Sequence, residues 1–190
     1  MRHFILSAAM MAACLPVIHA NANDTTKIVD QSFEVLGSVG YTWLRGNELV
    51  YENGNRISHL IWETGAPLLQ LSARAKLGDD WTVSARASTA FAGTSHMADY
   101  DWLLPHRIDF AFDNWTDRSL HPNTLLDRYL ELDVALGRDF ALDGNASINV
   151  HGGFRYTNVK WTAYGGSFVY SDLGFRDDVG GFSPSQIISY

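Results

Sequence analysis

The sequence predicts an all-β protein, and more narrowly a transmembrane antiparallel up-and-down β-barrel. Three observations favour this fold: long segments of alternating apolar and polar residues, charged residues on the polar side of that alternation, and an N-terminal export signal. A barrel in lipid directs apolar side chains outward and polar ones inward. The core of a soluble β-sandwich could not bury so many unpaired charges.

The first 22 residues are typical of a secretory signal peptide. A basic start precedes an apolar run, and the tripeptide ANA at 20–22 fits the small-residue pattern at which signal peptidase cuts. The run is too short to span a bilayer as a helix. We therefore expect residues 23–190 to form the exported protein. The only cysteine of the sequence, Cys14, lies in the signal peptide and would be removed with it. The exported protein would then have no thiol nucleophile, disulfide or zinc–thiolate site.

The exported part is acidic. Removing residues 1–22 takes away one of the 14 Lys and Arg and none of the 21 Asp and Glu, which leaves a formal net charge of −8. This charge disfavours nucleic acid as a partner and favours cationic ligands, although acidic residues also serve solubility.

The clearest strands surround a short turn at residues 78–80. Apolar residues at odd positions alternate with polar ones from Leu69 to Leu77 and from Trp81 to Phe91. The same pattern predicts strands over residues 32–51, 56–77, 81–95, 124–137 and 146–160, with a sixth beginning near Ser185.

The alternation also separates an outer face from an inner one. Charged side chains expected inside the barrel are Arg74, Lys76, Arg86, Glu131 and Asp133. Short connections near 78–80 and 138–145 alternate with long ones at 92–124 and 160–186, as periplasmic turns alternate with extracellular loops. Single-chain bacterial barrels have an even number of strands, at least eight, and lipid tolerates no open edge. With about five to six strands, we expect an incomplete barrel.

Two carboxylates, Asp99 and Asp101, lie two positions apart in the segment MADYDW at 97–102. On an extended backbone both side chains project from one face, with Cα atoms about 6.6 Å apart. Each charge makes ionisation of the other more costly, and the gap suits a single water molecule. The alternative is a solvated loop that carries two surface acids.

Two other chemical interpretations are disfavoured by spacing. Asp117, Ser119 and His121 suggest a nucleophilic triad, but steps of about 6.6 Å along an extended strand exceed the roughly 2.6 to 3.2 Å contact that a serine and its base require. A metal site formed by the acidic pair and His96 lacks a further histidine at ligand spacing. We therefore predict no metal.

Several segments resemble the omptin family of outer-membrane proteases. WTDRSLHPNT at 115–124 is similar to a family signature, MADYDW resembles the family's acidic pair, and the resemblance continues in WTAYGGSFVY at 161–170 and GFRDDVG at 174–180. Omptins are ten-stranded, vase-shaped barrels of the bacterial outer membrane, with an active site at the extracellular rim. The resemblance implies the N-terminal portion of an endopeptidase that cleaves peptides next to basic residues.

The resemblance also implies roles for individual residues. Asp99 and Asp101 would be the catalytic pair, which faces an Asp–His dyad across a groove so that a water molecule between them attacks the peptide bond. Glu48 would receive the Arg or Lys side chain of the substrate, although it could also be an exposed acid at a strand end. Asp117 would add to the same negative field or cap its loop.

The family's dyad lies in the later half of the barrel. No Asp-x-His segment occurs in residues 1–190, so we expect this chain alone to be inactive. None of the histidines considered sits in that motif: His59, His96, His106, His121 and His151.

Lipid is a further partner that the resemblance implies. Omptins bind lipopolysaccharide, but here Asn158 stands where the family places an arginine, which puts lipopolysaccharide dependence in doubt. Arg155 and Lys160 could compensate. No cofactor is otherwise expected, and the expected partners are basic peptides or proteins and outer-membrane lipid.

One conflict of side-chain direction calls for a local irregularity. Odd positions from Trp81 to Phe91 point outward, yet Asp99 and Asp101 must face the groove. We expect a bulge or turn between Gly93 and Met97 that resets the register.

Two rival functions stay open at this stage. A non-catalytic outer-membrane barrel or adhesin could bind cationic peptides with the same acidic residues and cleave nothing. A soluble periplasmic β-protein would share the alternation but not the lipid-facing surface.

Overall fold

The computed structural model describes residues 25–30, 33–78, 80–142 and 146–189. The expected signal peptide lies outside the described residues. The described chain forms a single antiparallel sheet, which confirms the all-β prediction. No helix among these residues is long and apolar enough to cross a membrane.

The described residues form eight strands, which are β1 (Thr25–Asp30), β2 (Phe33–Glu52), β3 (Asn55–Leu77), β4 (Trp81–Ala90), β5 (Thr94–Asp101), β6 (Asp117–Ala141), β7 (Ser147–Tyr170) and β8 (Asp178–Ser189). A single 3₁₀ turn, η1 (Phe112–Asn114), lies between β5 and β6. The order in the sheet is β1-β2-β3-β4-β6-β7-β8. Within the described residues, no pairing joins the end strands β1 and β8.

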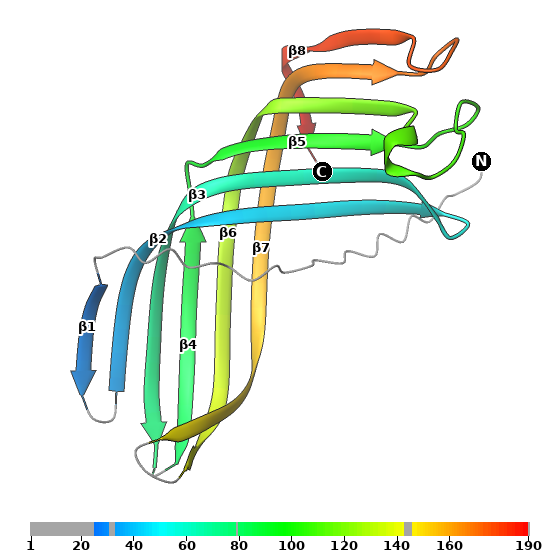
Figure 1. Ribbon diagram of the computed structural model, residues 1–190. Coiled ribbons are helices and arrows are strands. Elements are labelled where there is room, and N and C mark those ends of the chain that lie inside the picture. The colour runs from blue at the N-terminus through cyan, green and yellow to red at the C-terminus, as the bar shows by residue number, and fades with distance from the viewer. Residues whose placement is uncertain (1–24, 31–32, 79, 143–145, 190) are drawn as a thin grey trace, which may run out of the picture.

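β4 and β5 share their neighbours. Both pair with β3 on one side and β6 on the other, so together they occupy one strand position. Figure 1 shows the result as one continuous sheet that bends between a lower part, which contains β4, and an upper part, which contains β5.

All five predicted strands are present, but the predicted long connections are wrong. β5 and the upper part of β6 occupy about half of 92–124, and the upper part of β7 and most of β8 occupy most of 160–186. The connections that remain are residues 102–116 and 171–177. The upper strands were not predicted because polar residues occur on their outer face as well as on their inner face. Apolar and polar residues therefore do not alternate along them.

The lower part of the sheet has an apolar outer face. Cross-strand partners project from the same side of a sheet, so the registers of β2, β3, β4, β6 and β7 place one set of exposed apolar side chains on one face. These side chains are Phe33, Val39, Tyr41, Trp43, Leu69, Leu71, Leu77, Trp81, Val83, Leu132, Val134, Leu136, Phe140, Ile148, Val150, Phe154 and Tyr156. So large a contiguous apolar surface is suited to lipid.

The opposite face of the lower part carries the charged residues, as the sequence predicts. One row of cross-strand partners joins Ser72, Arg86, Asp133 and Arg155. The Nε of Arg155 lies 3.0 Å from Asp133 Oδ2. This ion pair therefore joins the consecutive strands β6 and β7 on the inner face.

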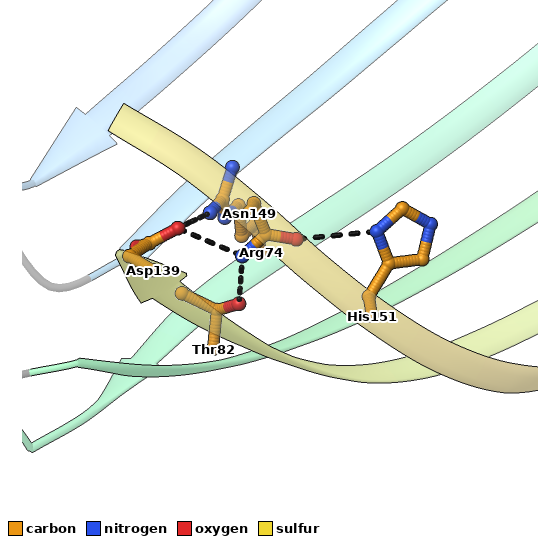
Figure 2. Close-up of polar contacts among 5 residues, drawn as sticks. All are labelled: Arg74, Thr82, Asp139, Asn149 and His151. Atoms are coloured by element: carbon orange, nitrogen blue, oxygen red, sulfur yellow. Dashed lines mark hydrogen bonds and ion pairs between the residues drawn. The ribbon is translucent and has the colours of Figure 1, made fainter. Parts of the chain in front are cut away.

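A second inner network lies near the lower end of the sheet (Figure 2). Arg74 Nη2 lies 3.1 Å from Asp139 Oδ1, and Asn149 Nδ2 donates to the same oxygen at 2.7 Å. The Asn149 amide also reaches Thr82 Oγ1 at 3.2 Å and His151 Nδ1 at 3.2 Å. These bonds connect β3, β4, β6 and β7 on the inner side.

A register reset is present, as predicted, but it lies at residues 91–93, because β5 pairs with β3 without a shift from Thr94 to Asp101. β4 ends at Ala90, Ala92 adopts a positive φ of 51°, and β5 begins at Thr94. A register shift between Ser95 and Met97 then follows in the pairing of β5 with β6. The break thus begins slightly before the expected interval, and it turns odd positions from the outer face to the inner face.

Candidate functional site

Four carboxylates gather on the inner face of the upper sheet. Leu60 of β3 is the direct partner of both Glu48 and Asp99, which places these three side chains in one row. In the next row, Asp101 pairs with Asp117 of β6. β3 runs unbroken from this region to the lower sheet, so the carboxylates share the face of the inner charged residues. The candidate site residues predicted from sequence are therefore brought together.

Ser58 links the acidic pair. It is the cross-strand partner of Asp101, and its Oγ donates to Asp99 Oδ1 at 3.3 Å. Both aspartates belong to strand β5 and are half-buried, so they do not lie in a solvated loop. The alternative of a solvated loop with two surface acids is therefore wrong.

The environment raises the pKa of both aspartates. Burial, with the nearby charge of Asp101, raises the pKa of Asp99 to about 7, although the Ser58 hydrogen bond opposes the rise. Burial also raises the pKa of Asp101, where the Ser58 bond again lowers it and the charge of Asp117 raises it. A carboxyl group with a pKa near 7 can exchange protons at neutral pH.

Glu48 lies on the opposite side of Leu60 from the aspartates. Burial raises the pKa of Glu48, and a hydrogen bond with Trp62 partly offsets that rise. Glu48 is half-buried rather than fully exposed, so a cation placed against it would meet a charge that water solvates only in part.

The row below the carboxylates is an apolar floor. Trp62, Met97 and His121 follow one another across β3, β5 and β6 and are essentially inaccessible to solvent. The ring of Trp161 stacks on Trp62 at 5.9 Å, and its indole nitrogen donates to Thr64 at 2.7 Å. This floor excludes water from beneath Asp99, which explains why burial is the largest cause of its pKa shift.

Asp117 begins β6 and contacts the connection between β7 and β8. Its Oδ1 accepts a hydrogen bond from the backbone nitrogen of Ser171 at 3.1 Å. Asp117 thus holds this connection at the start of β6, and its charge helps to raise the pKa of Asp101.

The predicted separation of Ser119 and His121 is wrong. His121 Nε2 lies 2.9 Å from Ser119 Oγ. The prediction used the distance between Cα atoms, but two side chains on the same face can incline toward each other and come into contact. The triad is still incomplete, since His121 Nδ1 contacts the carbonyl oxygen of Gly165 and Asp117 contacts Ser171 instead. The carbonyl only accepts, so Nδ1 carries the proton and Nε2 accepts from Ser119.

His96 does not join the acidic pair. It projects from the outer face, where its Nε2 contacts Glu63 Oε2 at 2.7 Å. Among the described residues, no group of three or more His, Cys, Asp or Glu could hold a metal ion.

Sequence reasoning missed Ser58 and Trp62. Both occupy even positions of the predicted strand 56–77, the same parity as the inward-facing Arg74, so their inner location could have been read from the alternation. The alternation could not reveal that Ser58 contacts Asp99, 41 positions away, or that Trp62 contacts Glu48, 14 positions away.

The chain is similar to several known proteins. The model of the Omptin family matches residues 29–190. The chain is 28% identical to the plasminogen activator of Yersinia pestis over 179 residues, covering 87% of this chain and 54% of that protein. It is 30% identical to protease 7 of Escherichia coli strain K12 over 146 residues, covering 73% of this chain and 43% of that protein.

Two further similarities concern the membrane and the fold. Outer membrane protease OmpP of Escherichia coli strain K12 is 28% identical over 196 residues, covering 97% of this chain and 60% of OmpP. The crystal structure of outer membrane protease OmpT from Escherichia coli superposes with a TM-score of 0.69 at 25% identity, covering 87% of this chain and 55% of OmpT. The chain spans about half the length of these relatives.

The apolar outer face of the lower strands and these relatives place the protein in the bacterial outer membrane. Its sheet has the antiparallel barrel fold of OmpT. The match to the family model covers the great majority of the described residues. The chain is a member of the Omptin family.

Proposed function

We propose that the protein is an outer-membrane endopeptidase in which Asp99 and Asp101 hold and polarise a hydrolytic water. The observation that carries this proposal is the half-buried acidic pair above an apolar floor, where the pKa of Asp99 is raised to about 7 by burial and by Asp101. A carboxyl group poised near neutral pH can orient a water molecule and take part in its deprotonation.

The hydrolytic step needs a group opposite the pair. In the proposed reaction the water oxygen attacks the carbonyl carbon, the peptide C–N bond breaks, and a proton passes to the leaving amine. The family resemblance implies an Asp–His dyad as the partner base, and residues 1–190 contain no Asp-x-His segment. We therefore expect the 190-residue chain to be inactive by itself and the complete site to require both halves.

Specificity for basic residues would come from Glu48. A charge-assisted bond between this partly desolvated carboxylate and an Arg or Lys side chain is stronger than the same bond at an open surface. Asp117 adds negative charge on the same face. Basic peptides and proteins are the proposed substrates, and the active-site loops 102–116 and 171–177 are proposed to face the cell exterior.

Lipid is proposed to contact the apolar outer face described above. Asn158 donates to the hydroxyl of Tyr156 at 2.9 Å, so its amide is engaged with an aromatic neighbour on the same strand. An amide carries no charge with which to bind a phosphate. We therefore propose that activation by lipopolysaccharide is weaker here than an arginine at this position would give.

A non-catalytic adhesin would use the same acids differently. Four carboxylates on one face would bind a cationic peptide whether or not a base completes the site. The two functions separate by experiment, because an adhesin binds basic peptides with unchanged covalent structure.

The test is cleavage of a fluorogenic peptide by the full-length protein in detergent, with one Arg or with norleucine at the same position. We expect Glu48→Gln to reduce kcat/KM for the Arg peptide by roughly 10 to 100-fold, since a bond to a charged group is lost. The matched control is Glu52→Gln, an exposed acid at the end of β2. Equal losses in both variants, or binding of the Arg peptide without cleavage, would refute the proposal.

A further inference from the structure

Three aromatic side chains line the inner face beside the acidic row. Phe168 and Tyr170 of β7 stack with ring centroids 4.5 Å apart, and Phe182 of β8 lies 5.1 Å from Phe168. All three are half-buried, so each leaves part of its surface accessible. We call these residues the aromatic shelf.

The register fixes where the shelf lies relative to the acidic pair. Asp99 pairs with Ser119, and Ser119 pairs with Phe168, so Phe168 belongs to the same row two strands away. At the usual strand spacing this is about 10 Å between Cα atoms. Glu48 lies two strands away in the opposite direction. The acidic pair therefore separates the proposed binding position of the basic residue from the shelf.

Two glycines create the space that the rings occupy. Phe168 lies over Gly180, where an added Cβ would come within 2.5 Å of the ring. Phe182 is the partner of Gly166 and reaches across it to stack on His121 at 5.2 Å and 25°. Because His121 is itself held by Ser119 and Gly165, the shelf rests on a rigid base.

The surroundings of the shelf disfavour an acidic occupant. Asp178 is the partner of Tyr170, and Asp117 lies in the neighbouring acidic row. An acidic side chain would be repelled by these carboxylates, whereas an apolar side chain would cover the exposed ring faces and leave water.

We propose that the aromatic shelf is a specificity subsite for an apolar side chain of the substrate, on the opposite side of the cleaved bond from the basic residue that Glu48 binds. An extended peptide advances about 3.3 Å per residue, so a displacement of about 10 Å corresponds to two or three residues. This inference rests on the proposed endopeptidase function. It adds a second requirement, besides the basic residue, to what the site recognises.

The experiment uses the full-length protein in detergent and peptides that contain one Arg in a background of Ser. A single Phe is placed at each of the three positions on either side of the Arg, and a matching series carries Asp. At one of the positions beyond the cleaved bond, we expect the peptide with Phe to have a kcat/KM about tenfold higher than the peptide with Ser. This is a typical gain from filling an apolar subsite. Asp at the same position should lower it.

In Phe168→Ala, the ratio of kcat/KM for the Phe peptide to kcat/KM for the Ser peptide should be close to one. Phe168→Leu, which keeps a smaller apolar side chain, should give an intermediate ratio and guards against a folding defect in the alanine variant. The control is Val179→Ala, since Val179 is 71% exposed on the outer face of β8, opposite to the shelf. Its ratio should equal that of the unmodified protein.

An unmodified protein with no preference at any position, or a ratio unchanged in both Phe168 variants, would overturn the subsite. Failure of the unmodified protein to cleave any Arg peptide would instead refute the proposed function. In that case the ratio of dissociation constants for the same Phe and Ser peptides, measured by fluorescence anisotropy, still decides whether the shelf binds apolar side chains.

Discussion

Glu48 and Asp99 lie in one row of the sheet, two strands apart, with Leu60 between them as the direct partner of both. Leu60 is 4% exposed, so an apolar side chain separates the two carboxylates. The charge of Glu48 is nevertheless close enough to contribute to the raised pKa of Asp99. A substrate cation bound at Glu48 would remove part of this repulsion, which couples binding of the basic residue to the ionisation of the acidic pair.

Asp99 should make the stability of the protein depend on pH. Its pKa is about 7 in the folded protein, against a usual value of 3.8, because of burial and Asp101. The folded state therefore binds more protons between pH 4 and 7, and stability falls as the pH rises through this window.

We expect Asp99→Asn to remove this dependence and to be more stable than the unmodified protein at pH 8, by on the order of 3 kcal/mol. Urea unfolding in detergent at pH 5 and pH 8, followed by tryptophan fluorescence, measures the difference. A parallel loss of stability with pH in both proteins would show that other groups are responsible.

Gly166→Ala should disrupt the junction of β6 and β7. Gly166 has a φ of 108°, and an added Cβ would lie 2.1 Å from the carbonyl oxygen of Leu120. We expect a loss of more than about 2 kcal/mol, since both backbone strain and a backbone clash are introduced. Gly152→Ala on the same strand is the control, because nothing lies within 4 Å of its Cβ position. Equal thermal stability of the two variants would contradict the prediction.

Arg176 should determine the order of both upper loops. Its Nε and Nη2 donate to the carbonyl oxygen of Trp115 at 3.0 and 2.7 Å, and Nη2 also donates to that of Asp113 at 2.7 Å. The guanidinium lies 3.5 Å above the ring of Trp115. Arg176→Lys keeps the charge but lacks the planar set of donors.

We expect amide hydrogen exchange in residues 102–116 to become about tenfold faster in Arg176→Lys, as bonds worth about 1 kcal/mol each are lost. Arg138→Lys, which changes an ion pair with Asp80 at the other end of the sheet, should leave that exchange unaltered. Protection that survives in Arg176→Lys would mean that the loop is held by its own contacts.

The lower strands could be predicted from the sequence because lipid imposes a strict alternation on them. Leu69, Leu71, Trp81 and Val83 face outward, and Arg74 and Arg86 face inward, as expected. Above the lipid-facing surface this constraint disappears. On β5, outward Ala98 and Tyr100 alternate with inward Met97 and Asp99, so apolar residues occupy both faces and the strand is not visible in the pattern.

The acidic pair could be predicted because its two-residue spacing depends only on local geometry. The parity conflict between β4 and β5 also predicted the register reset, although the reset lies at residues 91–93. By contrast, the Ser119–His121 contact depends on how two side chains lean, and the Cα spacing gave the wrong distance. The floor beneath Asp99 depends on the packing of Trp161 against Trp62, which are 99 positions apart, and no local pattern contains that information.

The most direct test of the account is the turnover of a basic fluorogenic peptide by full-length protein carrying Asp99→Asn. If Asp99 positions the hydrolytic water, kcat should fall by about 10² to 10⁴-fold with little change in KM, since the substrate's basic side chain still binds at Glu48. Asp80→Asn, which removes an exposed carboxylate at the other end of the sheet, should keep normal kcat. An Asp99→Asn protein with the kcat of the unmodified protein would contradict the account.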